Sequence, residues 1–370
     1  MERNYAIRLP DSSLQQSSTS VVLGSHGNLY GTTLLGGTYD SGSVFRLGRD
    51  KKGNWNYETL YSFAGGSDGS YPAAGLIFDA MGRLYGTTQY GGVISAKTPC
   101  AEQIGCGTIF ELAPHSGGTW TERVLHKFTG GRDGAQPLAT LIFDQAGDLY
   151  STASAGGGGG CDYLSVGCGA VFRLSHGMGG EWTADALYQF AASDGYFPLS
   201  ALITDSSGNF YGTTNAGGKG PGYIGGVGGQ DCPYGCGTVF ELTRSSGGAW
   251  NRSVLYSFTG INGDGSFPSD NLTFDAAGNL YGTTEWGGAY DQGTVFELIP
   301  GSGGRWKEIV IYSFGGGSDG SRPRGGLTFD TAGNLYGTTT VGGATISHAA
   351  MAVALSSNFL NQVAPGDCPL

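Results

Sequence analysis

The chain has 370 residues and a formal net charge of −11. This acidic balance argues against nucleic acid or an anionic membrane as the main partner, because both require clustered lysine and arginine. Hydrophobic residues make up 39% of the chain, which favours a folded core over disorder. No apolar run approaches 18 residues, so no membrane-spanning helix is predicted.

The first residues of the chain, Met1 to Tyr5, lack the apolar core of a signal peptide. We expect either that a secretion signal has been removed or that the natural chain begins elsewhere. Charged residues make up only 13% of the sequence, and the resulting neutral surface is common in proteins outside the cell.

A version of the motif Gly-Asn-Leu-Tyr-Gly-Thr-Thr then occurs six times. The copies are Gly27–Thr33, Gly82–Thr88, Gly147–Ala153, Gly208–Thr214, Gly278–Thr284 and Gly333–Thr339. Self-similarity at such a period indicates a repeat architecture, in which each unit packs against copies of itself. Residues common to every unit are expected to be scaffold, so a functional site is expected where the units differ.

One unit shows the predicted elements clearly. Short runs rich in β-branched and aromatic residues alternate with Gly, Asn, Asp and Ser turns, which is typical of strands. The predicted strands are 272–275, 280–284, 293–298 and 306–314. Adjacent apolar pairs such as Val295-Phe296 place hydrophobic side chains on both faces of the sheet, as a sheet covered on both sides requires. We predict an all-β fold, a six-bladed β-propeller of four-stranded antiparallel blades closed by a terminal strand.

Large aromatic residues recur at fixed places and are expected to fill the gaps between blades. The fourth strands begin at Trp55, Trp120, Trp182 and Trp250 and end at Phe63, Phe128, Phe190 and Phe258.

We predict a single domain over residues 1–370. Residues 1–20 form an N-terminal segment, 21–345 the repeats, and 346–370 a degraded last blade and a tail. The last blade has a weak third strand at 352–355 and needs an outer strand, which either Tyr5–Leu9 or Asn358–Val363 would supply. We favour closure by the N-terminal segment.

Gly-Asn-Leu-Tyr followed by Gly-Thr-Val-Phe, as at Gly237 and Gly293, resembles the bacterial extracellular repeat called GloVer, which occurs in "choice-of-anchor" surface proteins. The resemblance covers about residues 21–345 and implies a secreted or surface-displayed propeller of unestablished activity. A weaker resemblance to NHL and gluconolactonase-like propellers would imply a metal at the ring centre, but no matching Glu and Asn ligands are found here.

Six of the seven cysteines form close pairs, and each pair precedes a predicted third strand. The pairs are Cys100 with Cys106, Cys161 with Cys168, and Cys232 with Cys236. We predict three local disulfides that hold inserted loops, which favours a secreted or cell-surface location. Zinc is the alternative, but the sequence nearby supplies no further ligand pair. Cys368 remains, either free or bonded to another molecule.

Five loops between blades contain the pattern Asp-Gly-x-x-Pro. Their aspartates are Asp68, Asp133, Asp194, Asp264 and Asp319. Five carboxylates near one axis would suit a structural cation, whereas the simpler interpretation is a tight turn that leads into the next strand. No other cofactor is predicted.

The loops between the second and third strands differ most between units. Three adjacent blades have long, cysteine-bearing loops, and rigid scaffolds with variable loops commonly carry binding sites. We predict ligand-binding residues on these loops and at the bases of neighbouring ones. They are Tyr90, Glu102, Asp162, Tyr163, Asp231, Tyr234, Glu285 and Trp286. The alternative is that the disulfides only stabilise long loops.

Three functions are compatible with this sequence. The first is a secreted or surface-displayed protein that binds a glycan or an extracellular protein without catalysis. The second is a glycan hydrolase or lyase with Glu102 and Asp231 as an acid/base pair. The third is a structural subunit that assembles with copies of itself into filaments by strand donation. Histidines are scattered, and no nucleophile elbow or phosphate-binding loop is present.

Overall fold

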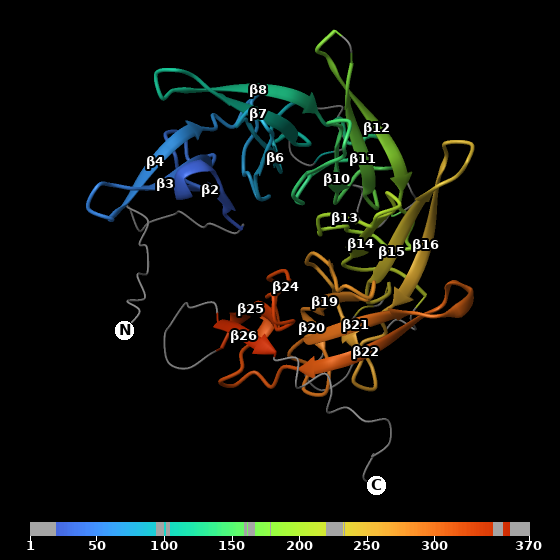
Figure 1. The fold of residues 1–370 in the computed structure, drawn as a ribbon. Coiled ribbons are helices and arrows are strands. Elements are labelled where there is room, and N and C mark those ends of the chain that lie inside the picture. Colours follow the sequence, from blue (N-terminus) through green and yellow to red (C-terminus); the bar gives the residue numbers. More distant parts are fainter. Residues whose placement is uncertain are drawn as a thin grey trace. The chain divides into compact units, whose positions relative to one another are not determined.

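The computed structural model describes residues 20–93, 100, 104–158, 161, 167–177, 179–219, 232, 234–342 and 351–355, the last range by its backbone only. The chain divides into two compact units, Met1–Gln189 and Phe190–Leu370, and each contains three antiparallel blade sheets (Figure 1). The described residues contain no α-helix and only two short 3-10 turns, Ser25–Gly27 and Ser302–Gly304. The predicted all-β, six-bladed β-propeller fold is confirmed.

In the first unit, each blade pairs four strands in sequence order. Blade 1 comprises β1 (Val22–Leu23), β2 (Leu29–Thr33), β3 (Ser43–Arg49) and β4 (Trp55–Ser62). Blade 2 comprises β5 (Ile77–Phe78), β6 (Leu84–Thr88), β7 (Thr108–Pro114) and β8 (Trp120–Lys127). Blade 3 comprises β9 (Ile142–Phe143), β10 (Leu149–Ala153), β11 (Ala170–His176) and β12 (Trp182–Gln189).

The second unit repeats this topology in its first two blades. Blade 4 comprises β13 (Ile203–Thr204), β14 (Phe210–Thr214), β15 (Thr238–Arg244) and β16 (Trp250–Ser257). Blade 5 comprises β18 (Thr273–Phe274), β19 (Leu280–Thr284), β21 (Thr294–Pro300) and β22 (Trp306–Ser313). A two-stranded pairing of β17 (Gly265–Ser266) with β20 (Trp286–Gly287) lies at the end of blade 5.

Blade 6 contains β24 (Thr328–Phe329), β25 (Leu335–Val341) and β26 (Met351–Leu355), and the short β23 (Ser321–Pro323) pairs with the end of β25. The predicted weak third strand is therefore confirmed as β26. Among the described residues, no strand pairs with the other edge of β26. Both predicted closing segments, Tyr5–Leu9 and Asn358–Val363, lie outside the described residues, and the single-domain boundary stays a prediction.

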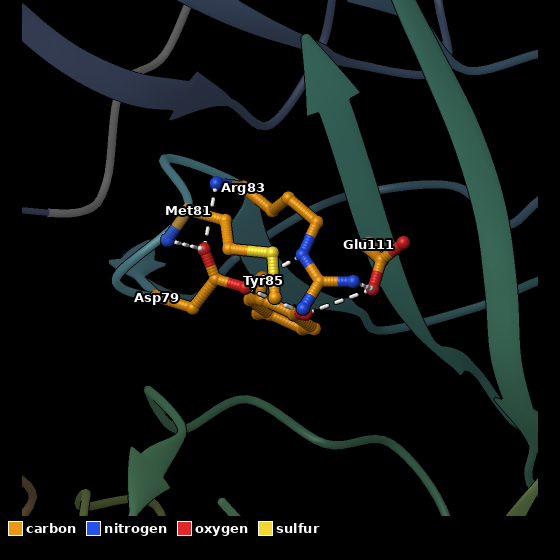
Figure 2. Close-up of polar contacts among 5 residues, drawn as sticks. All are labelled: Asp79, Met81, Arg83, Tyr85 and Glu111. Carbon is orange, nitrogen blue, oxygen red and sulfur yellow. Dashed lines mark hydrogen bonds and ion pairs between the residues drawn. The ribbon is translucent and has the colours of Figure 1, made fainter. Parts of the chain in front are cut away.

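The repeated tyrosine is explained by a polar network at the turn between the first and second strands (Figure 2). The Asp79 carboxylate accepts hydrogen bonds from the backbone amides of Met81 and Arg83, each at 2.9 Å. It also accepts one from the side-chain Nε of Arg83 at 2.6 Å. The Tyr85 hydroxyl donates to Glu111 at 2.8 Å and to Asp79 at 3.2 Å. Burial would raise the pKa of Asp79, but the hydrogen bonds and charge of Arg83 outweigh it and hold that pKa below its ordinary value.

Aromatic rings fill the space between neighbouring blades of one unit, as predicted. Phe63 at the end of β4 meets Phe110 of β7 edge-on, with ring centroids 5.1 Å apart. Phe258 and Phe296 make the same contact at 5.1 Å in the second unit. All four side chains are buried, so these ring pairs contribute apolar contact at the junctions.

In blade 2 the glycine before Thr-Thr packs directly against the phenylalanine of the third strand, whereas blade 3 has Ser151 at this position. A Cβ placed on Gly86 would lie 2.6 Å from Cζ of Phe110, inside its van der Waals surface. We expect Gly86→Ala to lower the free energy of unfolding by about 1–3 kcal/mol, because the ring has no free space to move into. Urea unfolding measures this effect. Gly117→Ala is the matched control, because nothing lies within 4 Å of its Cβ position; equal stability of the two variants would contradict the explanation.

Candidate binding face

The three predicted disulfides are present. They join Cys100 to Cys106, Cys161 to Cys168, and Cys232 to Cys236. In each pair the second cysteine is fully buried and lies two residues before the third strand of its blade. The disulfide prediction is confirmed and the zinc alternative is wrong, because these thiols are consumed in disulfide bonds. Cys368 lies outside the described residues.

The ends of the second-to-third strand loops share one conformation, whether or not they carry cysteine. The residue two before the strand-leading glycine has a positive φ: 53° for Asp40, 82° for Gly105, 98° for Gly235 and 54° for Asp291. In the cysteine-bearing loops this residue must be glycine, because a Cβ on Gly105 would lie 2.1 Å from the Gly91 carbonyl oxygen. The inserted loops therefore end in the same turn as the short loops.

This turn presents a large exposed side chain immediately before the positive-φ residue. Tyr234, one of the predicted site residues, is 52% exposed. Its counterparts in the other loops are Tyr39 at 62%, Ile104 at 44% and Tyr290 at 65%. Sequence reasoning missed Tyr39 and Tyr290, although alignment of the loops on the glycine before the third strand would have found them.

A second series of residues connects each loop to the next blade. These residues precede the proline of the Asp-Gly-x-x-Pro pattern and all have left-handed backbones. They are Tyr71, Gln136, Phe197, Phe267 and Arg322, with φ of 56°, 53°, 55°, 58° and 53°. We call them the left-handed linkers.

The linkers connect the disulfide loops to the predicted site residues. The amide of Phe267 donates to the carbonyl of Cys236 at 2.8 Å, and the carbonyl of Phe267 accepts the amide of Glu285 at 3.1 Å. In the first unit, Tyr71 makes the same pair of bonds to Ser41 and Gln89, at 2.9 and 3.0 Å. Within each unit, these loops and linkers therefore lie at the same end of the blades.

In the first unit, Tyr90 packs against the left-handed linker Tyr71. Its ring packs edge-on against the ring of Tyr71 with centroids 5.6 Å apart, and its hydroxyl accepts a hydrogen bond from Gln89 Nε2 at 3.0 Å. Burial, and then the neighbouring Tyr71, raise the pKa of Tyr90 above its ordinary value. The phenol therefore stays neutral and presents a polar edge beside an aromatic surface.

Glu285 and Trp286 form a different cluster in the second unit. Glu285 is only 8% exposed, and both its oxygens accept hydrogen bonds from Arg324, at 2.7 and 2.8 Å. The guanidinium of Arg322 lies 4.2 Å from the centroid of the Trp286 ring. The structure thus brings these two predicted residues together with two arginines that the sequence prediction did not include.

The remaining predicted site residues, Glu102, Asp162, Tyr163 and Asp231, lie outside the described residues. The acid/base pair of Glu102 and Asp231 therefore stays a prediction.

Comparison with known proteins identifies the repeat. The model of the Gloeobacter/Verrucomicrobia repeat matches residues 4–227 and 221–357. The chain belongs to this repeat family. The family resemblance predicted from the sequence is confirmed, and no curated protein sequence matches the chain.

Solved structures similar to this repeat protein are distant in sequence. A Penicillium chrysogenum α-L-arabinanase complexed with arabinobiose is 12% identical, with a TM-score of 0.50 over 93% of each chain. A Dyadobacter fermentans protein of unknown function is 12% identical, with a TM-score of 0.50 over 92% of this chain and 94% of its own. A Xanthomonas campestris gluconolactonase is 14% identical, with a TM-score of 0.44 over 88% of this chain and 83% of its own. At this identity the likeness shows the fold alone.

The turn aspartates of this repeat protein close their own loops. Each carboxylate accepts a backbone amide from the residue that opens its turn, at 2.7–2.9 Å. The donors, in chain order, are Ala64, Thr129, Ala191, Thr259 and Gly315, for Asp68, Asp133, Asp194, Asp264 and Asp319. Within the described part of the chain, no three His, Cys, Asp or Glu side chains gather as a metal site would require. These contacts support the turn interpretation, and the axial cation stays a prediction.

Two junctions between blades hold a second carboxyl group beside the turn aspartate. Glu122 of β8 lies near Asp68, and Glu308 of β22 lies near Asp264. Burial, and then the neighbouring aspartate, raise the pKa of each glutamate to about 7. One oxygen of each glutamate is buried without a hydrogen-bond partner among the described residues. The equivalent residue of β16 is Arg252, which instead pairs with Asp194 at 2.9 Å.

No helix within the described ranges has the length and apolar character needed to cross a bilayer.

Proposed function

We propose that this protein is a secreted binding protein that recognises a glycan without catalysis. The binding surface in each unit consists of the exposed loop residues and the left-handed linkers. Three disulfides support the extracellular assignment, because such bonds persist in oxidising compartments.

The observation that carries the proposal is the repeated left-handed backbone at the linkers. An L-residue with a large side chain is disfavoured there by about 1–2 kcal/mol, whereas glycine adopts this conformation freely. Five linkers nevertheless keep a tyrosine, a glutamine, two phenylalanines and an arginine. The backbone is constant while the side-chain chemistry varies, which is what a binding surface on a repeat scaffold requires.

The side chains at this surface favour a sugar as the ligand. Tyrosine and tryptophan offer flat apolar faces with a polar edge, which suits a ring that carries hydroxyl groups. Polar side chains lie beside these rings, namely Gln89 at Tyr90 and Arg322 at Trp286. The arabinanase solved with arabinobiose has a similar fold and holds a sugar, although it lends no residue to this proposal.

Tyr90→Ala, Tyr234→Ala and Trp286→Ala should each weaken binding to the glycan that an array identifies, by about tenfold, because each removes an aromatic contact. Affinity is measured by titration calorimetry. Met81→Ala is the matched control, because Met81 is 76% exposed but lies at the turn between β5 and β6, away from these loops.

Three results would contradict the proposal. The first is an absence of glycan binding in the array. The second is unchanged affinity in all three variants. The third is release of reducing ends that Glu102→Gln or Asp231→Asn abolishes, which would establish the hydrolase or lyase alternative instead.

A further inference from the structure

Arg322 is the one linker with a permanent charge, and the structure holds its backbone firmly. Its amide donates to the carbonyl of Gln292 at 2.8 Å, and its carbonyl accepts the hydroxyl of Thr340 at 2.9 Å. The guanidinium lies 4.2 Å from the centre of the Trp286 ring. The backbone hydrogen bonds and the ring contact together restrict this side chain before a ligand binds, which reduces the entropic cost of recognition.

No carboxylate of the described residues neutralises Arg322. The neighbouring Arg324 is paired with Glu285 through two hydrogen bonds. Arg46, Arg83, Arg173 and Arg252 also form ion pairs with carboxylates. Arg49 also lies over an indole, that of Trp55, so what distinguishes Arg322 is its place among the left-handed linkers, beside two of the predicted site residues.

An arginine fixed in this way can recognise a carboxylate. Its planar guanidinium matches the two oxygens of a carboxylate through two parallel hydrogen bonds, and contact with an aromatic ring leaves the in-plane N–H groups available. Glu285 forms its ion pair with Arg324 and none with Arg322 among the described residues.

We propose that Arg322 and Trp286 form a subsite for the carboxylate of a uronic acid in the bound glycan. This inference rests on the proposed glycan-binding function and narrows it to acidic polysaccharides. In this arrangement Arg322 binds the negatively charged carboxylate of the sugar, and the aromatic residues of the loops contact the uncharged parts of the glycan.

Polygalacturonate and its fully methyl-esterified form provide the test, because they share one backbone and differ in the carboxylate. We expect calorimetry to show tighter binding of polygalacturonate. Arg322→Gln should reduce that affinity by about tenfold or more and leave binding of the ester unchanged. The affinity of Arg322→Lys for polygalacturonate should lie between those of the native protein and Arg322→Gln, because lysine keeps the charge but cannot make the two parallel hydrogen bonds. Arg322→Gly should fold normally, since glycine tolerates a φ of 53°. Its affinity for polygalacturonate should fall as much as that of Arg322→Gln.

Arg49→Gln is the matched control, because Arg49 also lies over an indole, at 4.6 Å from the Trp55 ring, but at the far end of β3. Equal affinity for polymer and ester, or unchanged affinity in Arg322→Gln, would overturn the inference while the glycan-binding function stands. Absence of binding to any glycan would overturn both. Arg322-dependent binding of an acidic peptide but of no glycan would overturn the choice of a sugar.

Discussion

Glu122→Gln and Glu308→Gln should each stabilise the protein at pH 8 and change its stability little at pH 5. Each glutamate lies beside a turn aspartate in a partly buried junction, and burial and that aspartate raise its pKa to about 7. Above this pH the junction holds two negative charges. Glutamine keeps the shape of the side chain and removes one of them.

The sign follows from proton linkage. The folded pKa lies above the ordinary value of 4.5, so the folded state binds the proton more tightly than the unfolded chain. The favourable contribution is complete below about pH 4.5 and is lost as the pH rises through 7. After allowance for solvent screening, we expect a loss of about 1–3 kcal/mol per glutamate at pH 8.

The loss of stability at low pH comes from groups whose pKa is lowered by folding, not raised. The pKa values of Asp79 and Asp205 are lowered, because hydrogen bonds from Arg83 and Asn209 outweigh the effect of burial. Their contribution is present above the unfolded pKa near 4 and is lost as the pH falls through the lower folded value. Maximum stability is therefore expected between about pH 4 and pH 7.

Urea unfolding at pH 5 and pH 8 tests the two glutamates. The difference in free energy of unfolding between the two pH values should shrink in each variant and shrink most in the double variant. Glu181→Gln is the control, because Glu181 is exposed. An unchanged pH dependence in the double variant would show that the carboxyl pairs do not titrate as proposed.

Much of the fold was predictable because each blade repeats the same local chemistry. The predicted strands at 280–284 and 306–314 agree with β19 and β22 to within one residue. The first strands are shorter than predicted, since β18 pairs only Thr273 and Phe274 with β19. In blades 2, 4 and 5 the hydroxyl of the repeated tyrosine bonds two carboxylates, as Tyr85 does with Asp79 and Glu111, which gives the repeat a local chemical reason for this residue.

The candidate site was only partly predictable. Tyr90, Glu285 and Trp286 stand out because they depart from the repeat. The linkers were missed because no side-chain pattern signals a left-handed backbone at Tyr71 or Phe267, residue types that normally avoid it. The pairing of Glu122 with Asp68 was also missed, because it depends on how neighbouring blades pack and not on local sequence.

Removal of the disulfide between Cys232 and Cys236 should lower both stability and ligand affinity. In the short loops of blades 1 and 5 an aspartate closes the turn: Asp40 accepts the amide of Gly36 at 2.9 Å, and Asp291 accepts that of Gly287 at 3.0 Å. Blade 4 has Gly235 at the position of that aspartate. There the Gly217 amide donates to the Gly235 carbonyl at 3.1 Å, and the disulfide between Cys232 and Cys236 spans the same turn.

For the Cys232→Ala/Cys236→Ala variant we expect a loss of about 2 kcal/mol in the free energy of unfolding from the closed loop alone. The disulfide also packs in the core with Phe258 and Leu272, so the smaller side chains leave a cavity that adds to the loss. Because the Cys236 carbonyl accepts the amide of linker Phe267, binding should weaken together with stability.

Thermal unfolding with and without a reductant measures how much the disulfides contribute to stability. Reductant should lower the Tm of the native protein, and it should have no effect on a variant in which all three pairs are alanine. Asp291→Ala provides the comparison, because its loop is closed by a hydrogen bond and not by a disulfide. This variant should lose about 1 kcal/mol in the free energy of unfolding, with or without reductant. If native protein and triple-pair variant had the same Tm, the disulfides would add nothing to stability, and a loop-holding role for them would have to be abandoned.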